Sequence, residues 1–239
     1  MCESYHGTTR YAGRVTVDAV LFDFSGTLFR LGDDESWAAD LITADGRPMD
    51  ANESAEILRR MTTPVGQSVR FDERTQYAWD NRDLDSELHR EAYTAVLRQS
   101  GVPEAQAERL YARSVNPDGW TPYPDTGKVL EGLAARGIPI AVVSNIAFDF
   151  RPAFVARGWA PYITAFALSY EIGAMKPDPR IFEWALERVG TRNALMVGDS
   201  AHADGAATEV GCKFALVEPL PTFERRTGLL DAVVSHGLL

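Results

Sequence analysis

The sequence predicts an α/β fold, in which a doubly wound, Rossmann-like parallel sheet forms the core and a helical cap domain follows the first strand. From Trp120 onward, apolar segments typical of buried strands alternate with amphipathic helical segments, as they do in proteins with parallel sheets. Residues 31–119 show helical periodicity only. We therefore expect a core of residues 1–30 and 120–239 and a cap of residues 31–119.

The composition is that of a globular protein that binds neither nucleic acid nor a membrane. The 239 residues are 45% hydrophobic, and the net charge of −10 comes without a basic stripe. Cys2 and Cys212 are too few for a disulfide framework, and residues 1–13 lack the apolar centre of a signal peptide. No stretch reaches the roughly 20 apolar residues that cross a bilayer. We expect a cytoplasmic monomer or homodimer.

The first strand is predicted at Val15–Phe24, where β-branched and aromatic residues form one apolar run. In the cap, helices are predicted at Ala51–Met61, Asp85–Ser100 and Glu104–Ser114. The second of these has apolar residues three and four positions apart, which is typical of an amphipathic helix. No strand is predicted within the cap.

Beyond residue 120 the predicted elements alternate between helix and strand. The helix at Pro179–Val189, for example, places Ile181, Phe182, Ala185 and Leu186 on one face. The predicted elements of this region are a helix from Asp125 or Thr126 to Ala135, a strand at Ile138–Val143, a helix at Phe148–Arg157, a strand within Tyr162–Ser169, the helix at Pro179–Val189, a strand at Ala194–Val197, a helix at Ala203–Val210, a strand at Phe214–Val217 and an edge strand at Ala232–Val234.

Polar residues stand at four places in the predicted core, most of them at strand ends. Because the carboxyl ends of parallel strands meet at one edge of a sheet, side chains placed there converge. Each residue taken alone also fits a turn, a surface position or a helix cap. The residues are Asp23 after the first strand, Ser144 and Asn145 after the second, Lys176 between two prolines, and Asp199 and Asp204 after a short buried strand.

These residue types suit a site that binds a phosphoryl group. The Ser144 hydroxyl and the amides that follow it can donate hydrogen bonds to an anionic oxygen. The Lys176 ammonium is a point charge that can hold two anionic groups together. Asp199 and Asp204 would repel Asp23 unless a divalent cation lay among them, and Mg²⁺ prefers oxygen ligands of this kind.

Four segments resemble the motifs of the haloacid dehalogenase-like hydrolase superfamily. They are Asp23-x-Ser-Gly-Thr-Leu, Ser144-Asn145, Lys176-Pro177 and Gly198-Asp199-x4-Asp204, and they occur in the order of that superfamily. The helical insertion between the first two motifs resembles the cap of the first subfamily. That subfamily includes enzymes similar to phosphoglycolate phosphatase, β-phosphoglucomutase and 2-haloacid dehalogenase.

The resemblance implies a nucleophile and a metal site. Asp23 would attack phosphorus in line and form an aspartyl-phosphate, which water then hydrolyses. Mg²⁺ would be held by the Asp23 carboxylate, the main-chain carbonyl of Ser25 and Asp199, with Asp204 as a further ligand or beside the ligands. The implied partner is a small phosphorylated metabolite.

The resemblance also implies which residues bind that substrate. Ser144 and Lys176 would bind the phosphoryl oxygens, and both belong to the implied catalytic set with Asp23 and Ser25. Asn145 and Thr27 are the further substrate-binding positions, and Thr27 would also support the turn of the first motif.

Ser25 departs from the usual pattern of the family's phosphatases, which carry a second aspartate at this position. That aspartate protonates the leaving oxygen and then activates water, and such help is worth about 10²–10⁴-fold. A serine hydroxyl can do neither at neutral pH. Three readings stay open: a leaving group that needs little protonation, a long-lived aspartyl-phosphate, or a proton supplied by His202 or His89.

The sequence therefore predicts one leading function and leaves two alternatives open. The leading function is a Mg²⁺-dependent phosphatase. The first alternative is a slow or inactive family member with a binding or regulatory role, because of Ser25. The second is a 2-haloacid dehalogenase, a type that resembles Asp-x-Tyr-Gly-Thr and needs no metal. Residues 31–119 contain no lysine, which argues against the Schiff-base mechanism of phosphonatases.

Several cap features are weaker candidates for substrate contacts. Aromatic residues there are expected in the cap core more than at a ligand. The candidates are the arginines Arg30, Arg70 and Arg74, the segment Thr62–Gln67, and the aromatic residues Trp37, Tyr77 and Trp79.

Overall fold

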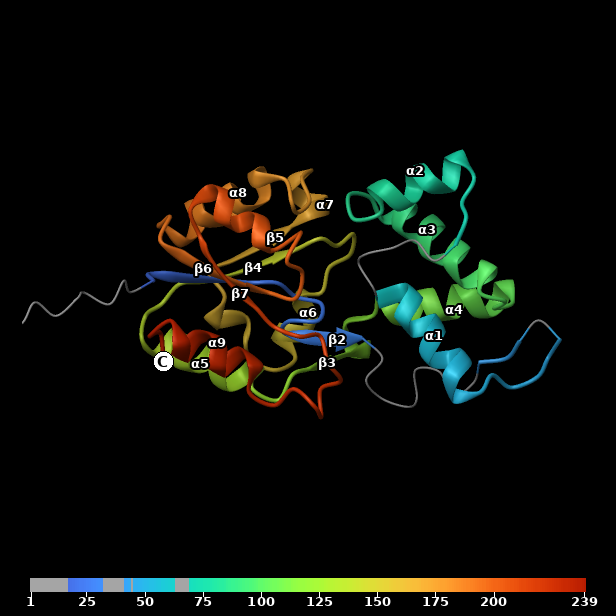
Figure 1. Ribbon diagram of the computed structural model, residues 1–239, viewed down its shortest axis with the longest axis horizontal. Coiled ribbons are helices and arrows are strands. Elements are labelled where there is room, and N and C mark those ends of the chain that lie inside the picture. Colours follow the sequence, from blue (N-terminus) through green and yellow to red (C-terminus); the bar gives the residue numbers. More distant parts are fainter. Residues whose placement is uncertain (1–16, 32–40, 44, 63–68) are drawn as a thin grey trace, which may run out of the picture.

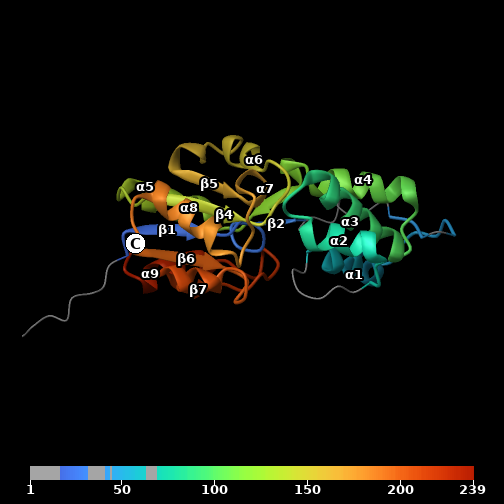
Figure 2. The ribbon, with the colours of Figure 1, turned by 90° about the horizontal axis from the view of Figure 1, so that it is seen from above.

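The computed structural model describes residues 17–31, 41–43, 45–62 and 69–239. Figures 1 and 2 show two lobes side by side, one built around a sheet and one containing helices α1–α4. A two-stranded antiparallel ribbon joins the lobes, formed by β2 (Phe29–Leu31) and β3 (Trp120–Pro122). The predicted domain limits fall in this ribbon, and we propose it as the boundary between core and cap.

Within the part of the chain that the structure describes, the sheet of the core has five parallel strands in the order β5-β4-β1-β6-β7. The strand β1 lies at the centre, and its last residue, Phe22, pairs with Val142 on one side and Val197 on the other. This arrangement confirms the predicted α/β class. The strands are β1 (Ala19–Phe22), β4 (Ile140–Ser144), β5 (Ala165–Leu168), β6 (Ala194–Gly198) and β7 (Lys213–Leu216).

Helices cover both faces of the sheet, so the fold is doubly wound (Figure 1). Side chains alternate along β1: Val20 and Phe22 pack in one apolar cluster, whereas Ala19 and Leu21 pack in the other. The first cluster includes residues of α5 (Thr126–Ala135), α6 (Arg151–Val155) and α9 (Gly228–Ser235), and the second includes residues of α8 (Pro179–Val189) and η4 (Gly205–Val210).

The predicted edge strand at Ala232–Val234 is wrong, because these residues lie in helix α9. Leu229, Ala232 and Val233 are buried at helical spacing, so they cover the sheet instead of extending it. Asp125 begins α5 but caps α9: its carboxylate accepts main-chain hydrogen bonds from Leu229 at 2.9 Å and Leu230 at 3.0 Å. Because the two segments lie far apart in the chain, no local sequence pattern predicts this contact.

Other elements differ from the sequence prediction in their limits. Helix α6 is shorter than predicted, and the segment before Gly211 is a 3₁₀ helix instead of an α-helix. The remaining short elements are η2 (Pro117–Gly119), which directly precedes the ribbon, and η3 (Ala160–Tyr162) and α7 (Ser169–Ile172) of the core.

The described residues of the cap lobe form four helices. The helix α2 was not predicted; Asp72 begins it by accepting a hydrogen bond from the Thr75 amide at 2.8 Å. Asp85 begins α3 in the same way through the amides of Glu87 and Leu88. The helices are α1 (Ala51–Thr62), α2 (Glu73–Asn81), α3 (Ser86–Gln99) and α4 (Glu104–Ser114).

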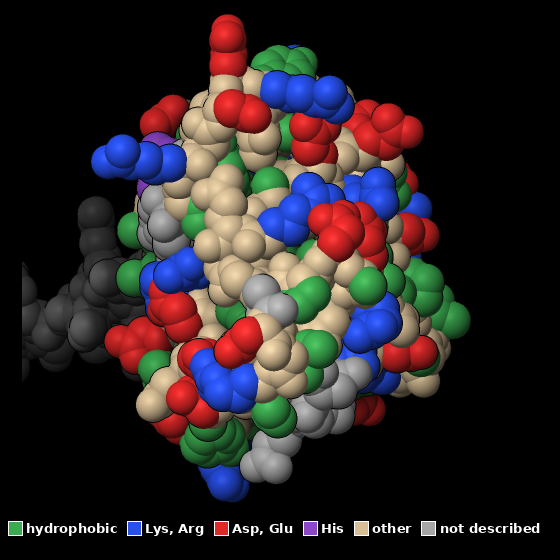
Figure 3. Space-filling view, turned by 90° about the vertical axis from the view of Figure 1, so that its right-hand side faces the viewer, with side chains coloured by type: hydrophobic (Ala, Val, Ile, Leu, Met, Phe, Trp, Pro, Cys, Tyr) green, Lys and Arg blue, Asp and Glu red, His purple; other side chains and the backbone are tan. Residues whose placement is uncertain are grey.

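The outer face of the cap lobe carries charges of both signs. Figure 3 shows acidic and basic side chains interspersed over this face, without a continuous basic area. Exposed ion pairs join neighbouring helices, including Arg74 with Glu91 at 2.8 Å and Arg90 with Glu108 at 2.8 Å.

Candidate active site

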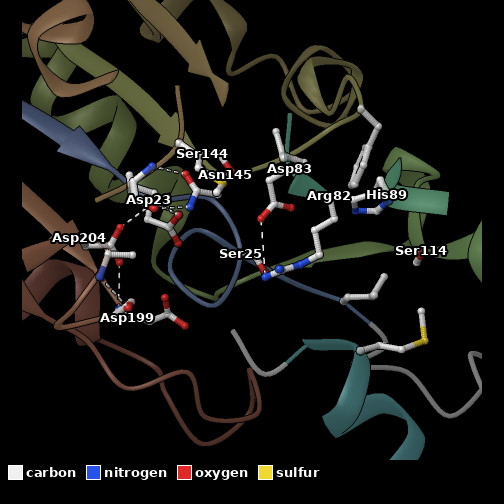
Figure 4. Close-up of a pocket in the computed structure, with 18 of the residues that line it drawn as sticks. Asp23, Ser25, Arg82, Asp83, His89, Ser114, Ser144, Asn145, Asp199 and Asp204 are labelled. Carbon is white, nitrogen blue, oxygen red and sulfur yellow. Dashed lines mark hydrogen bonds and ion pairs between the residues drawn. The ribbon is translucent and has the colours of Figure 1, made fainter. Parts of the chain in front are cut away.

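A pocket of about 280 Å³ lies between the two lobes. The carboxyl ends of β1, β4 and β6 form its floor, and the cap contributes the opposite wall (Figure 4). The structure brings nearly all of the predicted site residues to this pocket. Those that line it are Asp23, Ser25, Ser144, Asn145, Lys176, Asp199 and Asp204, whereas Thr27 is buried beneath it.

The Lys176 ammonium joins the ends of β1 and β4 to the start of η4. It donates hydrogen bonds to Asp23 Oδ1 at 2.6 Å, Asp204 Oδ1 at 2.6 Å and the main-chain oxygen of Val143 at 2.9 Å. The side chain is 3% exposed, so all three ammonium donors are used inside the protein. A buried cation with two carboxylates is held far more rigidly than an exposed ion pair.

Asn145 fixes the backbone that carries this lysine. Its side-chain amide donates to the Lys176 carbonyl at 2.8 Å and accepts from the Lys176 amide at 2.6 Å. The Asn145 side chain therefore positions Lys176, and its contact with a substrate stays a prediction. Ser144, one residue earlier, is 1% exposed at the floor of the pocket.

Two glycines allow the acidic side chains to approach the backbone. Gly198 ends β6, and a Cβ atom there would collide with the carboxyl of Asp204. Gly26 has a φ of 79°, and a Cβ atom there would collide with the carboxyl of Asp199. Both glycines are thus required by the packing of the carboxyls against the strand ends.

Three carboxylates gather around one lysine. One oxygen from each of Asp23, Asp199 and Asp204 lies within 4.8 Å of the others. Burial raises the pKa of Asp23 to about 6, against the lowering effect of Lys176. Burial, followed by the charges of Asp23 and Asp204, raises the pKa of Asp199 to about 8. Negative charge is therefore in excess here.

The donor set fits a divalent cation. Asp23 Oδ2 is buried and has no hydrogen-bond partner in the described part of the chain. The Thr27 hydroxyl, also without a partner at hydrogen-bonding distance, has only a minor lowering effect on the pKa of Asp23. Both oxygens of Asp204 are engaged, one by Lys176 and one by the Ser200 amide at 2.9 Å. Asp23 and Asp199 therefore offer a cation more accessible carboxylate oxygens than Asp204 does.

Comparison with known proteins decides the family. The sequence profile of the haloacid dehalogenase-like hydrolases matches residues 17–210. The chain belongs to this family of hydrolases. The four motifs are therefore read in their family order, with Asp23 in the first and Asp199 in the last.

Proteins similar to this chain include a phosphatase and a dehalogenase. Haloacid dehalogenase-like hydrolase domain-containing protein 3 of Mus musculus is 34% identical over 141 residues, which are 54% of this chain and 56% of that protein. Ribulose-1,5-bisphosphate 5-phosphatase of Halopiger xanaduensis is 31% identical over 57% of this chain and 71% of its own length. The L-2-haloacid dehalogenase of Xanthobacter autotrophicus has a similar structure, with a TM-score of 0.62, 25% identity, and coverage of 92% of this chain and 83% of that one.

No helix among the described residues of this hydrolase is long and apolar enough to span a membrane.

Arg225 supports the first motif of the hydrolase and was not predicted. Its guanidinium donates to the carbonyl of Gly26 at 2.7 Å and to the carbonyl of Thr27, and it lies 3.2 Å from the centroid of the Tyr123 ring. The side chain is buried although its surroundings in sequence are polar. No local pattern distinguishes this arginine from its exposed neighbour Arg226.

We expect Arg225→Ala to lower the free energy of unfolding by about 3 kcal/mol, because several charge-assisted hydrogen bonds are lost and two buried carbonyls lose their donor. Urea unfolding measures this change. The exposed Arg226 serves as the matched control, and Arg226→Ala should stay within about 0.5 kcal/mol of the wild type. Equal effects for the two variants would contradict the stabilisation of the first motif by Arg225.

The cap wall of the pocket contains residues that the sequence prediction missed. Arg82, Asp83 and Tyr93 line it, at the turn after α2 and on α3. His89 also lines it, but burial lowers the pKa of its ring to about 3, with a smaller contribution from Arg82. This histidine is neutral at neutral pH and does not supply a proton as an imidazolium. His202 lines the core side and is exposed.

None of the weaker candidates for substrate contacts that the structure describes lines the pocket. Arg74 pairs with Glu91, and Arg30 donates to the Pro219 carbonyl. Tyr77 is 62% exposed, and Trp79 contacts Arg82 outside the lining of the pocket. The remaining candidates are Arg70, which is exposed and away from the pocket, and Trp37 and residues 63–67, which lie outside the described residues.

We expect the metal-free protein to lose stability as the pH rises from about 7 to about 8. The folded-state pKa values of Asp23 and Asp199, about 6 and about 8, lie above the ordinary value of 3.8. The folded state therefore keeps protons that the unfolded state has released, and its advantage shrinks as those protons leave. Urea unfolding in a chelator at about pH 7 and about pH 8, above the range in which the lowered pKa of His89 acts in the opposite direction, measures the trend, and a higher stability at the upper pH would contradict it.

Proposed function

We propose that this hydrolase is a Mg²⁺-dependent phosphatase that acts on a small phosphorylated metabolite through an aspartyl-phosphate. The observation that carries the proposal is the position of Asp23. Its carboxylate lies at the end of the central strand, at the floor of the pocket between the lobes, beside a buried lysine and two further carboxylates. This is the environment that a carboxylate nucleophile and a metal would share.

Each residue at the floor of the pocket has its own role in the proposed reaction. Asp23 would attack the phosphorus atom, while Lys176 keeps that carboxylate ionised and directed by its 2.6 Å hydrogen bond. The Ser144 hydroxyl and neighbouring main-chain amides would donate to the phosphoryl oxygens. The same groups then hold the phosphoryl group while water displaces it from Asp23.

Mg²⁺ would be held by Asp23, the main-chain carbonyl of Ser25 and Asp199, with Asp204 beside them. Once bound, the cation supplies positive charge that offsets the carboxylates and the phosphoryl oxygens. The unpartnered Asp23 Oδ2 and the raised pKa values of the acids support this assignment. An unpartnered carboxylate oxygen and raised carboxyl pKa values are expected where positive charge is too small to balance the carboxylates.

Two observations support a small phosphorylated substrate. The pocket, at about 280 Å³, suits a metabolite more than a macromolecule. A relative that aligns over much of its length is by name a phosphatase of a sugar bisphosphate. The predicted cytoplasmic location and the monomeric or homodimeric state stay predictions.

A 2-haloacid dehalogenase is the second candidate, because the enzyme from Xanthobacter autotrophicus shares the fold over most of both chains. The acidic cluster of Asp23, Asp199 and Asp204 favours a metal site instead. The two activities separate cleanly in one assay. A dehalogenase would release halide from a 2-haloacid in the presence of a chelator, whereas the phosphatase would not.

The test is release of inorganic phosphate from a panel of small phosphate esters, acyl phosphates and phosphoanhydrides, with Mg²⁺ or with a chelator. We expect release that depends on Mg²⁺. Release of equal rate in the chelator would contradict the metal assignment. No release from any member of the panel would favour the slow or inactive relative with a binding role.

A further inference from the structure

One acidic side chain of the cap reaches the pocket on the side of Ser25. Arg82 and Asp83 form the turn between α2 and α3, and both line the pocket together with Asp23 and Ser25. Figure 4 shows the Asp83 carboxyl and the Arg82 guanidinium extending from the cap toward Ser25. Asp83 is 8% exposed, so its carboxyl belongs to the pocket and not to the outer surface.

The turn that carries Asp83 is fastened to the core. The Ser169 hydroxyl donates to the main-chain oxygen of Asp83 and accepts a hydrogen bond from the Ile146 amide at 2.8 Å. Ile146 directly follows Ser144 and Asn145, so this contact links the cap turn to the loop that forms the phosphoryl site. The carboxyl of Asp83 is thereby placed by the core as well as by the cap.

The groups around Asp83 hold its carboxyl and tune its proton affinity. Arg82 Nη2 lies 3.7 Å from Asp83 Oδ2, and Arg82 itself is fixed by a 2.6 Å hydrogen bond to the Trp79 carbonyl. Burial raises the pKa of Asp83, against the lowering charges of Arg82 and Lys176, and Tyr93 of α3 faces the same pair. A raised pKa favours the protonated carboxyl, which is the form that a general acid uses, and the carboxylate left after proton donation can act as a base.

We propose that Asp83 is the general acid and base of this hydrolase, in place of the aspartate that its relatives carry at the position of Ser25. The inference rests on the proposed phosphatase function. A carboxyl brought by the cap would meet the leaving group only when the cap lies over the bound substrate.

The steps balance in atoms and protons. In the first step Asp23 forms a bond to phosphorus, the bond from phosphorus to the leaving oxygen breaks, and Asp83 gives its proton to that oxygen. In the second step a water oxygen bonds to phosphorus, the Asp23–phosphorus bond breaks, and the Asp83 carboxylate takes the proton of the water. The net reaction is hydrolysis of the ester, and Asp83 ends protonated as it began.

The test compares Asp83→Asn with the wild type on two probes, 4-nitrophenyl phosphate and glycerol 2-phosphate. Glycerol 2-phosphate releases a strongly basic alkoxide, which needs a proton in order to leave. 4-Nitrophenyl phosphate releases the weakly basic nitrophenolate, which does not. We expect kcat/KM to fall about 10²–10³-fold for glycerol 2-phosphate and less than about 10-fold for 4-nitrophenyl phosphate. Because the second step also loses its base, the variant should release a burst of 4-nitrophenol equal to the enzyme present.

Asp80→Asn is the matched control, since Asp80 is exposed on α2 three residues away. It should leave both probes unchanged. Asparagine at position 83 keeps the main-chain oxygen that Ser169 contacts, and Ser25→Asp added to Asp83→Asn should recover at least about 10-fold of the lost activity on glycerol 2-phosphate. Recovery also shows that the single variant was folded.

Equal losses on the two probes, no burst, or no recovery by Ser25→Asp would overturn the role of Asp83 while leaving the phosphatase intact. A wild-type protein that releases no phosphate with Mg²⁺ from these two probes or from any member of the substrate panel would overturn the proposed function as well.

Discussion

Asp23→Asn is expected to abolish phosphate release, by at least about 10⁴-fold in kcat, because the amide is not a nucleophile and cannot form the aspartyl-phosphate. The side chain keeps its size, so the packing of the strand end is preserved. A continuous phosphate assay on the best substrate of the panel measures the loss.

Asp18→Asn provides the control for this variant. Asp18 is exposed just before the same strand, at the edge of the sheet opposite the site, and it should retain wild-type activity. Substantial turnover by Asp23→Asn would show that another group attacks the substrate.

Lys176→Met is expected to lower the stability of the metal-free protein by about 3–5 kcal/mol. The variant leaves the carboxylates of Asp23 and Asp204 buried without the cation that both contact at 2.6 Å. Urea unfolding in a chelator measures the change, and activity should be lost with it.

Two comparisons sharpen this result. Mg²⁺ should recover part of the lost stability, because it supplies charge to the same carboxylates. Lys128→Met, at an exposed position on α5, should change stability by less than about 0.5 kcal/mol. A Lys176→Met protein as stable as the Lys128→Met protein would contradict the proposed electrostatic balance of the site.

Strand ends were the part of this molecule that the sequence predicted best. A buried parallel strand is an apolar run, and the polar residue that ends it is visible in the sequence, as with Asp23 after Phe22 and Asp199 after Gly198. The helix α8 was predicted to the residue because Pro179 begins it and Gly190 ends it. These are local signals.

The contacts that local patterns cannot show were missed. Arg225 reaches the turn of the first motif across nearly 200 positions of sequence, and Asp125 caps a helix from the far end of the chain. The apolar Ala232–Val234 reads equally well as strand or helix, and only packing against the sheet decides. The position of Arg82 and Asp83 at the pocket depends on how the cap packs over the core, and the periodicity of the sequence does not show this packing.

The central claim is that Asp23 carries the phosphoryl group during turnover, and mass spectrometry of the protein after rapid acid quench tests it most directly. With substrate and Mg²⁺ present, we expect the peptide that contains Asp23 to gain one phosphoryl group, most strongly in Asp83→Asn, and to lose this mass in the chelator. Phosphate release without any phosphorylated Asp23, or a phosphoryl group found on another residue, would contradict the account.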